Sequence, residues 1–205
     1  EFHALPDAYS WRYQPELAGP MRAVTEIGSH WIDLVRYWTG LEVEAVSAQF
    51  EAFDPERKLR EGVMHRGGEG ELLKVPSEDV AMLSLRFSNG AIGNVVLSEV
   101  SHGRGNRLEL EISGTQQSLW WNNEHPYQLH VGEKFQGFKT FTYPFGDGFG
   151  QTFKASFEAI YRDIELGAIS PDHTYASFED GYRNAAVCMA AMRSSERDGK
   201  WVRCE

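Results

Sequence analysis

The feature that most constrains the fold is a pair of strand-like runs joined by a turn signal. Residues 81–87 alternate between apolar and polar side chains, Asn89 and Gly90 follow, and residues 92–100 form a second apolar run. This alternation is typical of a half-buried strand, and Asn-Gly between two strands predicts a hairpin with a type I′ turn. Strands joined in this way run antiparallel, so a purely parallel, doubly wound sheet is excluded.

Similar runs occur on both sides of this hairpin. They predict further strands at residues 43–50, 108–112, 118–121, 127–131 and 138–143. Residues 54–77 lack such a pattern, because they are polar, of mixed charge and contain several glycines. We predict a long loop or an insertion there.

Three other stretches have the periodicity of amphipathic helices. They are residues 25–40, a stretch from Phe149 that ends at Gly167, and a stretch that Ser177 and Asp180 cap. The sum is an α+β fold, with a large, open, mainly antiparallel sheet and helices packed on one face. We expect residues 1–205 to form a single domain. A broad sheet covered on only one side must meet another surface, so we expect a homo-oligomer through the open sheet face.

Charge and cysteine content exclude several classes of function. The sequence has 20 Lys and Arg against 30 Asp and Glu, which gives a net charge of −10. Such a surface repels a phosphate backbone, so we expect no nucleic-acid partner. No apolar run is long enough to cross a membrane, and no basic amphipathic stretch suggests attachment to one. Cys188 and Cys204 do not form a disulfide framework, so a cytoplasmic location is predicted.

The predicted helix over residues 25–40 carries the side chains best suited to chemistry. Glu26 and His30 are four positions apart, so they share one helix face near its start. A carboxylate and an imidazole in this arrangement can bind an alcohol and transfer its proton. The same pattern is typical of the solvated side of an amphipathic helix. Glu-x-x-x-His can also ligate a metal, but no third ligand is near in the sequence, and we predict no metal site.

Trp11 and Arg12 precede this helix in an irregular, proline-containing stretch. Arg12 offers a planar fork of hydrogen-bond donors beside an aromatic wall, so the pair is a candidate for substrate binding. Trp11 can equally anchor a loop on the core. The nearest match to a dinucleotide-binding G-x-G-x-x-G motif, at residues 103–108, lacks the third glycine and leads into a predicted strand. The sequence therefore shows no complete active site on its own.

The run from Val24 to Leu34 resembles the signature that opens the C-terminal domain of the Gfo/Idh/MocA oxidoreductases. These are the relatives of glucose–fructose oxidoreductase and inositol dehydrogenase. Residues 78–93 are similar to the family's central hairpin, residues 106–115 to its next strand and turn, and residues 177–202 to its last helix and closing strand. The resemblance covers nearly the whole chain and is weakest over residues 54–77 and 122–148.

The resemblance implies the substrate-binding and oligomerisation domain of an enzyme whose N-terminal Rossmann domain, missing from this chain, binds NAD or NADP. It implies that His30 and Glu26 bind the reacting hydroxyl of a sugar or polyol and shuttle its proton, while hydride passes to the nicotinamide. The acid of the family motif is usually Asp, so Glu26 reaches one methylene further. This chain alone is not expected to bind the cofactor tightly. The alternative is a non-enzymatic ligand-sensing or scaffold domain on the same fold.

Overall fold

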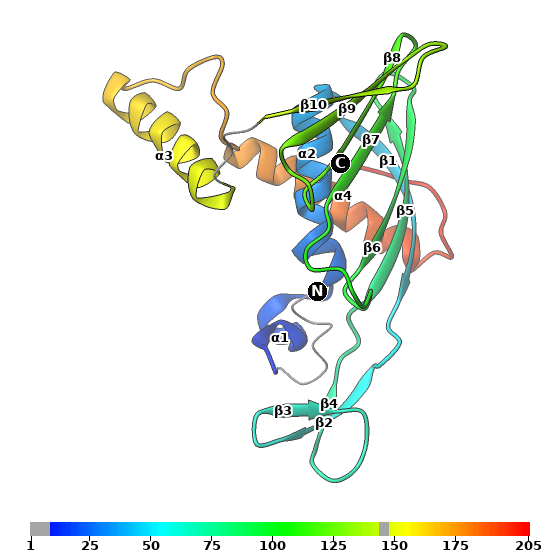
Figure 1. Cartoon of the computed structure of the whole chain (residues 1–205). Helices are drawn as coiled ribbons and strands as arrows, with labels where there is room; N and C mark the ends of the chain where they lie inside the picture. Colours follow the sequence, from blue (N-terminus) through cyan, green and yellow to red (C-terminus); the bar gives the residue numbers. More distant parts are fainter. Residues whose placement is uncertain (1–8, 144–147) are drawn as a thin grey trace. The chain divides into compact units, whose positions relative to one another are not determined.

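A computed structural model describes residues 9–143 and 148–205 of the chain (Figure 1). The fold is α+β, with open antiparallel sheets, as predicted. The chain divides into two compact units, one made of residues 1–105 and 182–205 and the other of residues 106–181. A single domain over residues 1–205 stays a prediction.

The first unit is built on a four-stranded antiparallel sheet in the order β11-β1-β5-β6. Its strands are β1 (Val43–Glu51), β5 (Val80–Phe87), β6 (Ile92–Ser98) and β11 (Val202–Arg203). Alternate residues of β5 are buried beneath the helices: Ala81, Leu83, Leu85 and Phe87. The other face of the sheet is open, and its apolar residues there include Met82 and its cross-strand partner Val96.

The hairpin between β5 and β6 forms as predicted, but its turn is of another type. The Gly90 N–H donates to the Phe87 carbonyl at 2.8 Å, and the Phe87 N–H donates to the Ala91 carbonyl at 2.9 Å. Within the loop, Gly90 has a φ of +85° while Asn89 does not have a positive φ. A type I′ turn needs positive φ at both central residues, so the prediction of that turn was wrong. The loop is instead a type I turn followed by a left-handed glycine.

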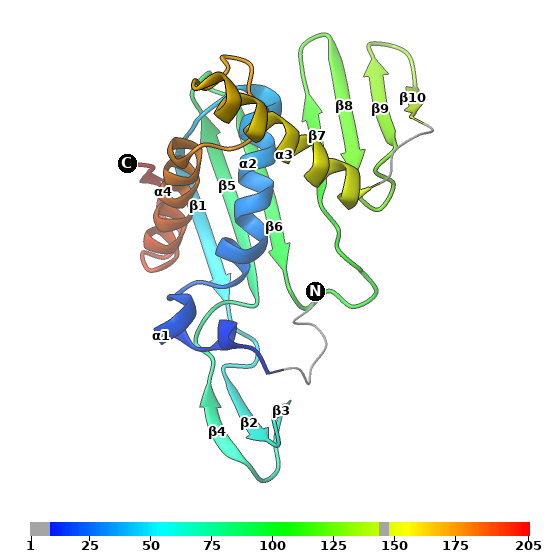
Figure 2. The same cartoon turned by 90° about the vertical axis from the view of Figure 1, so that its left-hand side faces the viewer.

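Two helices cover the same face of this sheet, as Figures 1 and 2 both show: α2 (Ser29–Thr39) and α4 (Phe178–Ser195). Helix α2 ends at Gly40, whose φ of +66° is the left-handed value that favours glycine at the end of a helix. The capping box predicted for α4 is present, because the Asp180 N–H donates to Ser177 Oγ at 3.2 Å and the Ser177 N–H donates to Asp180 Oδ2 at 2.9 Å.

The segment between β1 and β5 is not a long loop, so that prediction for residues 54–77 was wrong. It forms a small antiparallel sheet in the order β3-β2-β4, with β2 (Glu56–Arg60), β3 (Val63–His65) and β4 (Glu71–Lys74). These strands are too short to show a clear alternation in the sequence. Met64 and Val75 pack with Tyr13 in a small core. Tyr13 is the last residue of η1 (Trp11–Tyr13), and the short helix α1 (Pro15–Ala18) follows it along the chain. That this segment is an insertion stays a prediction.

The second unit contains a four-stranded antiparallel sheet in the order β10-β9-β8-β7 and helix α3 (Phe149–Leu166). Its strands are β7 (Glu109–Ser113), β8 (Gln117–Asn122), β9 (Gln128–Glu133) and β10 (Phe138–Thr142). All four match predicted strands to within a few residues. Helix α3 ends at Gly167, whose φ of +67° is the left-handed value that favours glycine at this position.

Candidate active site

The helix predicted over residues 25–40 is present, but it begins earlier and in another form. One turn of π-helix, η2 (Val24–Gly28), leads directly into α2. Its Ser29 N–H donates to the Val24 carbonyl, five residues back instead of four. Thr25 lies inside this π turn, and its hydroxyl lies 3.1 and 3.3 Å from two carbonyl oxygens of the preceding turn. Single π turns inside longer helices are frequent at functional sites.

Close packing against the sheet sets which side of this helix faces outward. A Cβ on Gly28 would come within 2.6 Å of Leu97 Cδ1 on β6, so glycine lets the helix rest on the strand. Further along α2, the side chains buried on this face are Trp31, Ile32 and Val35. Glu26 and His30 do not belong to this buried face, because Glu26 is partly exposed and His30 is exposed.

The structure brings three of the predicted site residues into direct contact. Arg12 Nε lies 2.8 Å from Glu26 Oε1, and both side chains are about one-third exposed. The Arg12 guanidinium also lies over the Trp11 ring, 4.9 Å from its centroid. His30 follows Glu26 four residues along the helix. Within the described part of the chain, no hydrogen bond or ion pair engages the His30 imidazole. An imidazole in this state is available to a ligand.

A buried charged cluster lies next to the start of this helix, and sequence reasoning missed it. Arg22 is only 1% exposed, its Nε lies 2.7 Å from Glu99 Oε2, and its Nη2 forms an ion pair with Asp79. The Tyr13 ring faces the guanidiniums of Arg22 and Arg57, 4.6 and 5.6 Å from its centroid. The members come from separate segments of the chain, so no local pattern indicates the cluster.

Acidic side chains outnumber basic ones in this cluster, because Glu78, Asp79 and Glu99 are buried with Arg22 and Arg57. Burial raises the pKa of Glu99 to about 7, against the opposing effect of the Arg22 guanidinium. Burial also raises the pKa of Glu78, although three backbone N–H groups oppose the rise. The buried carboxylates of this cluster therefore rely on the Arg22 guanidinium to balance their negative charge.

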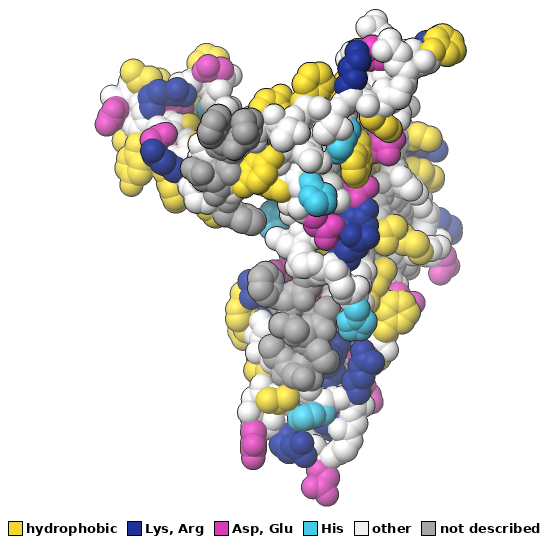
Figure 3. All heavy atoms as spheres, viewed as in Figure 1, with side chains coloured by type: hydrophobic (Ala, Val, Ile, Leu, Met, Phe, Trp, Pro, Cys, Tyr) yellow, Lys and Arg dark blue, Asp and Glu magenta, His cyan; other side chains and the backbone are white. Residues whose placement is uncertain are grey.

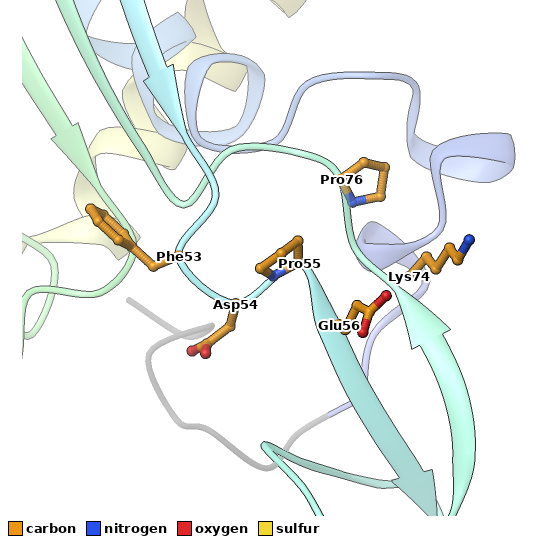
Figure 4. A pocket seen from close by; sticks show the side chains of 6 residues that line it. All are labelled: Phe53, Asp54, Pro55, Glu56, Lys74 and Pro76. Carbon is orange, nitrogen blue, oxygen red and sulfur yellow. The ribbon is translucent and has the colours of Figure 1, made fainter.

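A pocket in the first unit contains none of the predicted site residues. Figure 4 shows it where β1 leads into β2, lined by Phe53, Asp54, Pro55, Glu56, Lys74 and Pro76. It is open to solvent, and its Glu56 and Lys74 are partners across β2 and β4. An oppositely charged cross-strand pair of this kind is an ordinary feature of sheets, so the pocket offers no further argument for a site.

No group of three or more His, Cys, Asp or Glu side chains in residues 9–143 and 148–205 is placed to hold a metal ion. In the same residues, no helix has both the length and the apolar character needed to cross a bilayer.

The sequence profile of the GFO/IDH/MocA C-terminal domain matches residues 1–120, more than half of the chain. The chain belongs to this family. It is also 34% identical to the levoglucosan dehydrogenase of Pseudarthrobacter phenanthrenivorans, in an alignment that covers 94% of this chain and 54% of that protein. The GFO/IDH/MocA chain thus spans about half the length of this curated relative. The family assignment inferred from residues 24–34 and the later segments is confirmed.

Solved structures agree with this assignment. A levoglucosan dehydrogenase in complex with NADH and L-sorbose matches with a TM-score of 0.86 and 31% identity, over 100% of this chain and 56% of that one. An inositol dehydrogenase homologue complexed with NAD+ from Azotobacter vinelandii matches with a TM-score of 0.72, over 94% of this chain and 51% of that one. At 22% identity, this second match shows the fold alone.

Proposed function

We propose that this domain binds the substrate of an NAD(P)-dependent oxidoreductase that acts on a hydroxyl group of a sugar or polyol. The observation that carries the proposal is the exposed His30 imidazole four residues from Glu26, whose carboxylate the Arg12 guanidinium holds at 2.8 Å. Support for the substrate class comes from the relatives, which include a levoglucosan dehydrogenase with NADH and L-sorbose. Catalytic roles for His30 and Glu26, and substrate contacts by Trp11 and Arg12, are parts of this proposal.

The chemistry requires separate places for a hydride and a proton. An alcohol becomes a carbonyl when its carbon loses a hydride and its oxygen loses a proton, and a bound nicotinamide takes the hydride. In the proposed site, an imidazole nitrogen of His30 accepts the hydroxyl proton as a general base. Glu26 accepts a hydrogen bond from a substrate hydroxyl while Arg12 neutralises its charge. The Trp11 ring gives a sugar an apolar surface to lie against.

The described residues do not fit a dinucleotide. The glycine-containing turn near Gly103 leads into strand β7, and not into a helix whose N-terminus could hold a pyrophosphate. The sheets of both units pair their strands antiparallel, unlike the parallel sheet of a nucleotide-binding βαβ unit. We therefore propose that NAD or NADP binds to a further domain of a longer protein.

The proposal is tested with this chain joined to a nucleotide-binding half. Reduction of the nicotinamide would be followed by its absorbance, with NAD or NADP and a panel of sugars and polyols. We expect reduction of the nucleotide with at least one of these alcohols. If calorimetry shows that a sugar binds while no nucleotide is reduced with any of them, the ligand-sensing alternative is favoured and the enzymatic proposal is wrong.

We also propose that the open face of the β11-β1-β5-β6 sheet meets a second copy of the chain. Met82, Val96 and Ile92 are 50%, 65% and 82% exposed there, and exposed hydrophobic side chains are visible beside β5 and β6 in Figure 3.

Val96→Glu is expected to halve the molar mass measured by light scattering. Leu17→Glu, which changes a similarly exposed residue on α1, should leave the mass unchanged. A monomeric wild-type protein at micromolar concentration would contradict the proposal.

A further inference from the structure

The start of the candidate site helix is capped by a residue from a distant part of the chain. Glu78 lies just before β5, and its Oε1 accepts the backbone N–H groups of Arg22 at 3.0 Å and Val24 at 2.8 Å. Its main-chain oxygen accepts the Ala23 N–H at 3.4 Å. Three successive N–H groups at the start of the helix therefore all donate to Glu78. The first N–H groups of a helix have no acceptor within the helix itself, so they need one from elsewhere.

The cap is fixed in its position on the sheet. Glu78 is 3% exposed, so water cannot readily replace its carboxyl oxygen. The next residue, Asp79, donates its N–H to the Glu51 carbonyl of β1 at 2.9 Å and accepts the N–H of Phe53 on its Oδ2 at 2.8 Å. If the Glu78 side chain were shortened, the start of the helix would therefore have to move, because the backbone beside Glu78 is held against β1.

Helix α4 holds the far end of the π turn and also contacts its first residue. Asn184 of α4 donates its Nδ2 to the Ser29 carbonyl at 2.8 Å, and Cys188 Sγ lies 3.8 Å from the Val24 carbonyl oxygen. The turn that carries Glu26 is thus held between Glu78 at its start and α4 at its end. Because a π turn contains one more residue than an α turn, loss of this form would rotate Glu26 relative to His30.

We propose that Glu78 is a positioning residue for the Glu26–His30 site. By holding three N–H groups it keeps the π turn in place, and the π turn sets the direction in which Glu26 meets Arg12 and the substrate. The inference rests on the proposed function, and it gives Glu78 no contact with the substrate.

Two substitutions of Glu78, made in the chain joined to a nucleotide-binding half, distinguish the effect of side-chain length from the effect of side-chain charge. Glu78→Gln keeps the length and an acceptor oxygen, so kcat is expected to stay within about threefold of the wild type. Glu78→Asp keeps the charge but withdraws the oxygen by one methylene. Misplacement of reacting groups by about 1 Å can cost about 100-fold, so we expect kcat to fall by about 10- to 100-fold, with KM changed by less than about threefold.

Ser194→Ala is the matched control. Ser194 is also buried, accepts the Ala48 N–H at 2.9 Å and donates to the Lys200 carbonyl at 2.6 Å, but it ties α4 to β1 away from the π turn. Ser194→Ala should have a lower melting temperature than the wild type but the same kcat. The positioning role is wrong if Glu78→Asp loses no more kcat than Ser194→Ala, if its loss appears in KM alone, or if Glu78→Gln is equally impaired. A His30→Ala variant that retains full turnover would instead overturn the proposed function, and this inference with it.

Discussion

Replacing His30 by alanine in the chain joined to its nucleotide-binding half is expected to lower kcat by about 100- to 10,000-fold. That is the usual contribution of a positioned general base. The His30 side chain is exposed and has no hydrogen-bond or ion-pair partner among the described residues, so its loss should leave the melting temperature almost unchanged. KM for the sugar or polyol should change much less than kcat, because the interaction is needed most in the transition state.

His102→Ala provides the comparison, because His102 is also exposed but lies in the loop between β6 and β7. Its kcat should equal that of the wild type. Free imidazole added to the His30→Ala variant should restore part of the lost activity, since a small base can occupy the space that the side chain leaves. Equal kcat values for the wild type and His30→Ala would contradict the proposed role.

Replacing Arg22 by methionine is expected to lower the free energy of unfolding by about 3–5 kcal/mol, the usual cost of breaking a buried ion pair by removing one partner. Arg22 is 1% exposed and is paired with Asp79 and Glu99, which are themselves 2% and 1% exposed. Without the guanidinium, these carboxyl groups stay buried with one less positive charge. Because a typical domain is stable by only about 5–15 kcal/mol, urea denaturation should show a large shift of the midpoint.

Arg36→Met is the matched test, because Arg36 is also buried, at 7% exposure, and forms an ion pair. Its partner Glu42 is 42% exposed and also accepts a hydrogen bond from Arg183 at 2.7 Å, so Glu42 can return to solvent when Arg36 is lost. We expect a loss of about 1 kcal/mol or less for the pair itself, as for solvent-exposed ion pairs. If Arg22→Met and Arg36→Met lowered the free energy of unfolding by similar amounts, the buried cluster would contribute no more to stability than the partly exposed ion pair.

The longer strands of the two large sheets could be predicted because apolar side chains recur along them in the sequence, even in β10, whose side chains are all exposed. In β5, every second side chain is apolar and meets the helices. The small sheet within residues 54–77 was missed because its strands have three to five residues, too few to establish a period. The type of the β5–β6 turn was missed because the backbone conformation of Asn89 depends on how the two strands are paired.

The candidate site was predictable only in its local part. Glu26 and His30 lie on one helix, so their spacing and the family signature indicate them together. The contact of Arg12 with Glu26 joins an irregular segment to a helix, and no periodicity relates the two. Arg22, Glu78 and Glu99 look like ordinary surface charges in the sequence, because charge alone does not show that a residue is buried.

The hydrogen bonds that Glu78 accepts at the start of the site helix also affect the order in which parts of the protein fold. Glu78 lies 56 and 54 positions after the two residues whose N–H groups its carboxyl accepts. Contacts between such distant positions form late in folding, because a long loop must first be closed. During synthesis, α2 can therefore become helical well before its first turn takes its final shape. That turn is completed only when β5 has joined β1, and it is among the first parts to be lost when those strands separate.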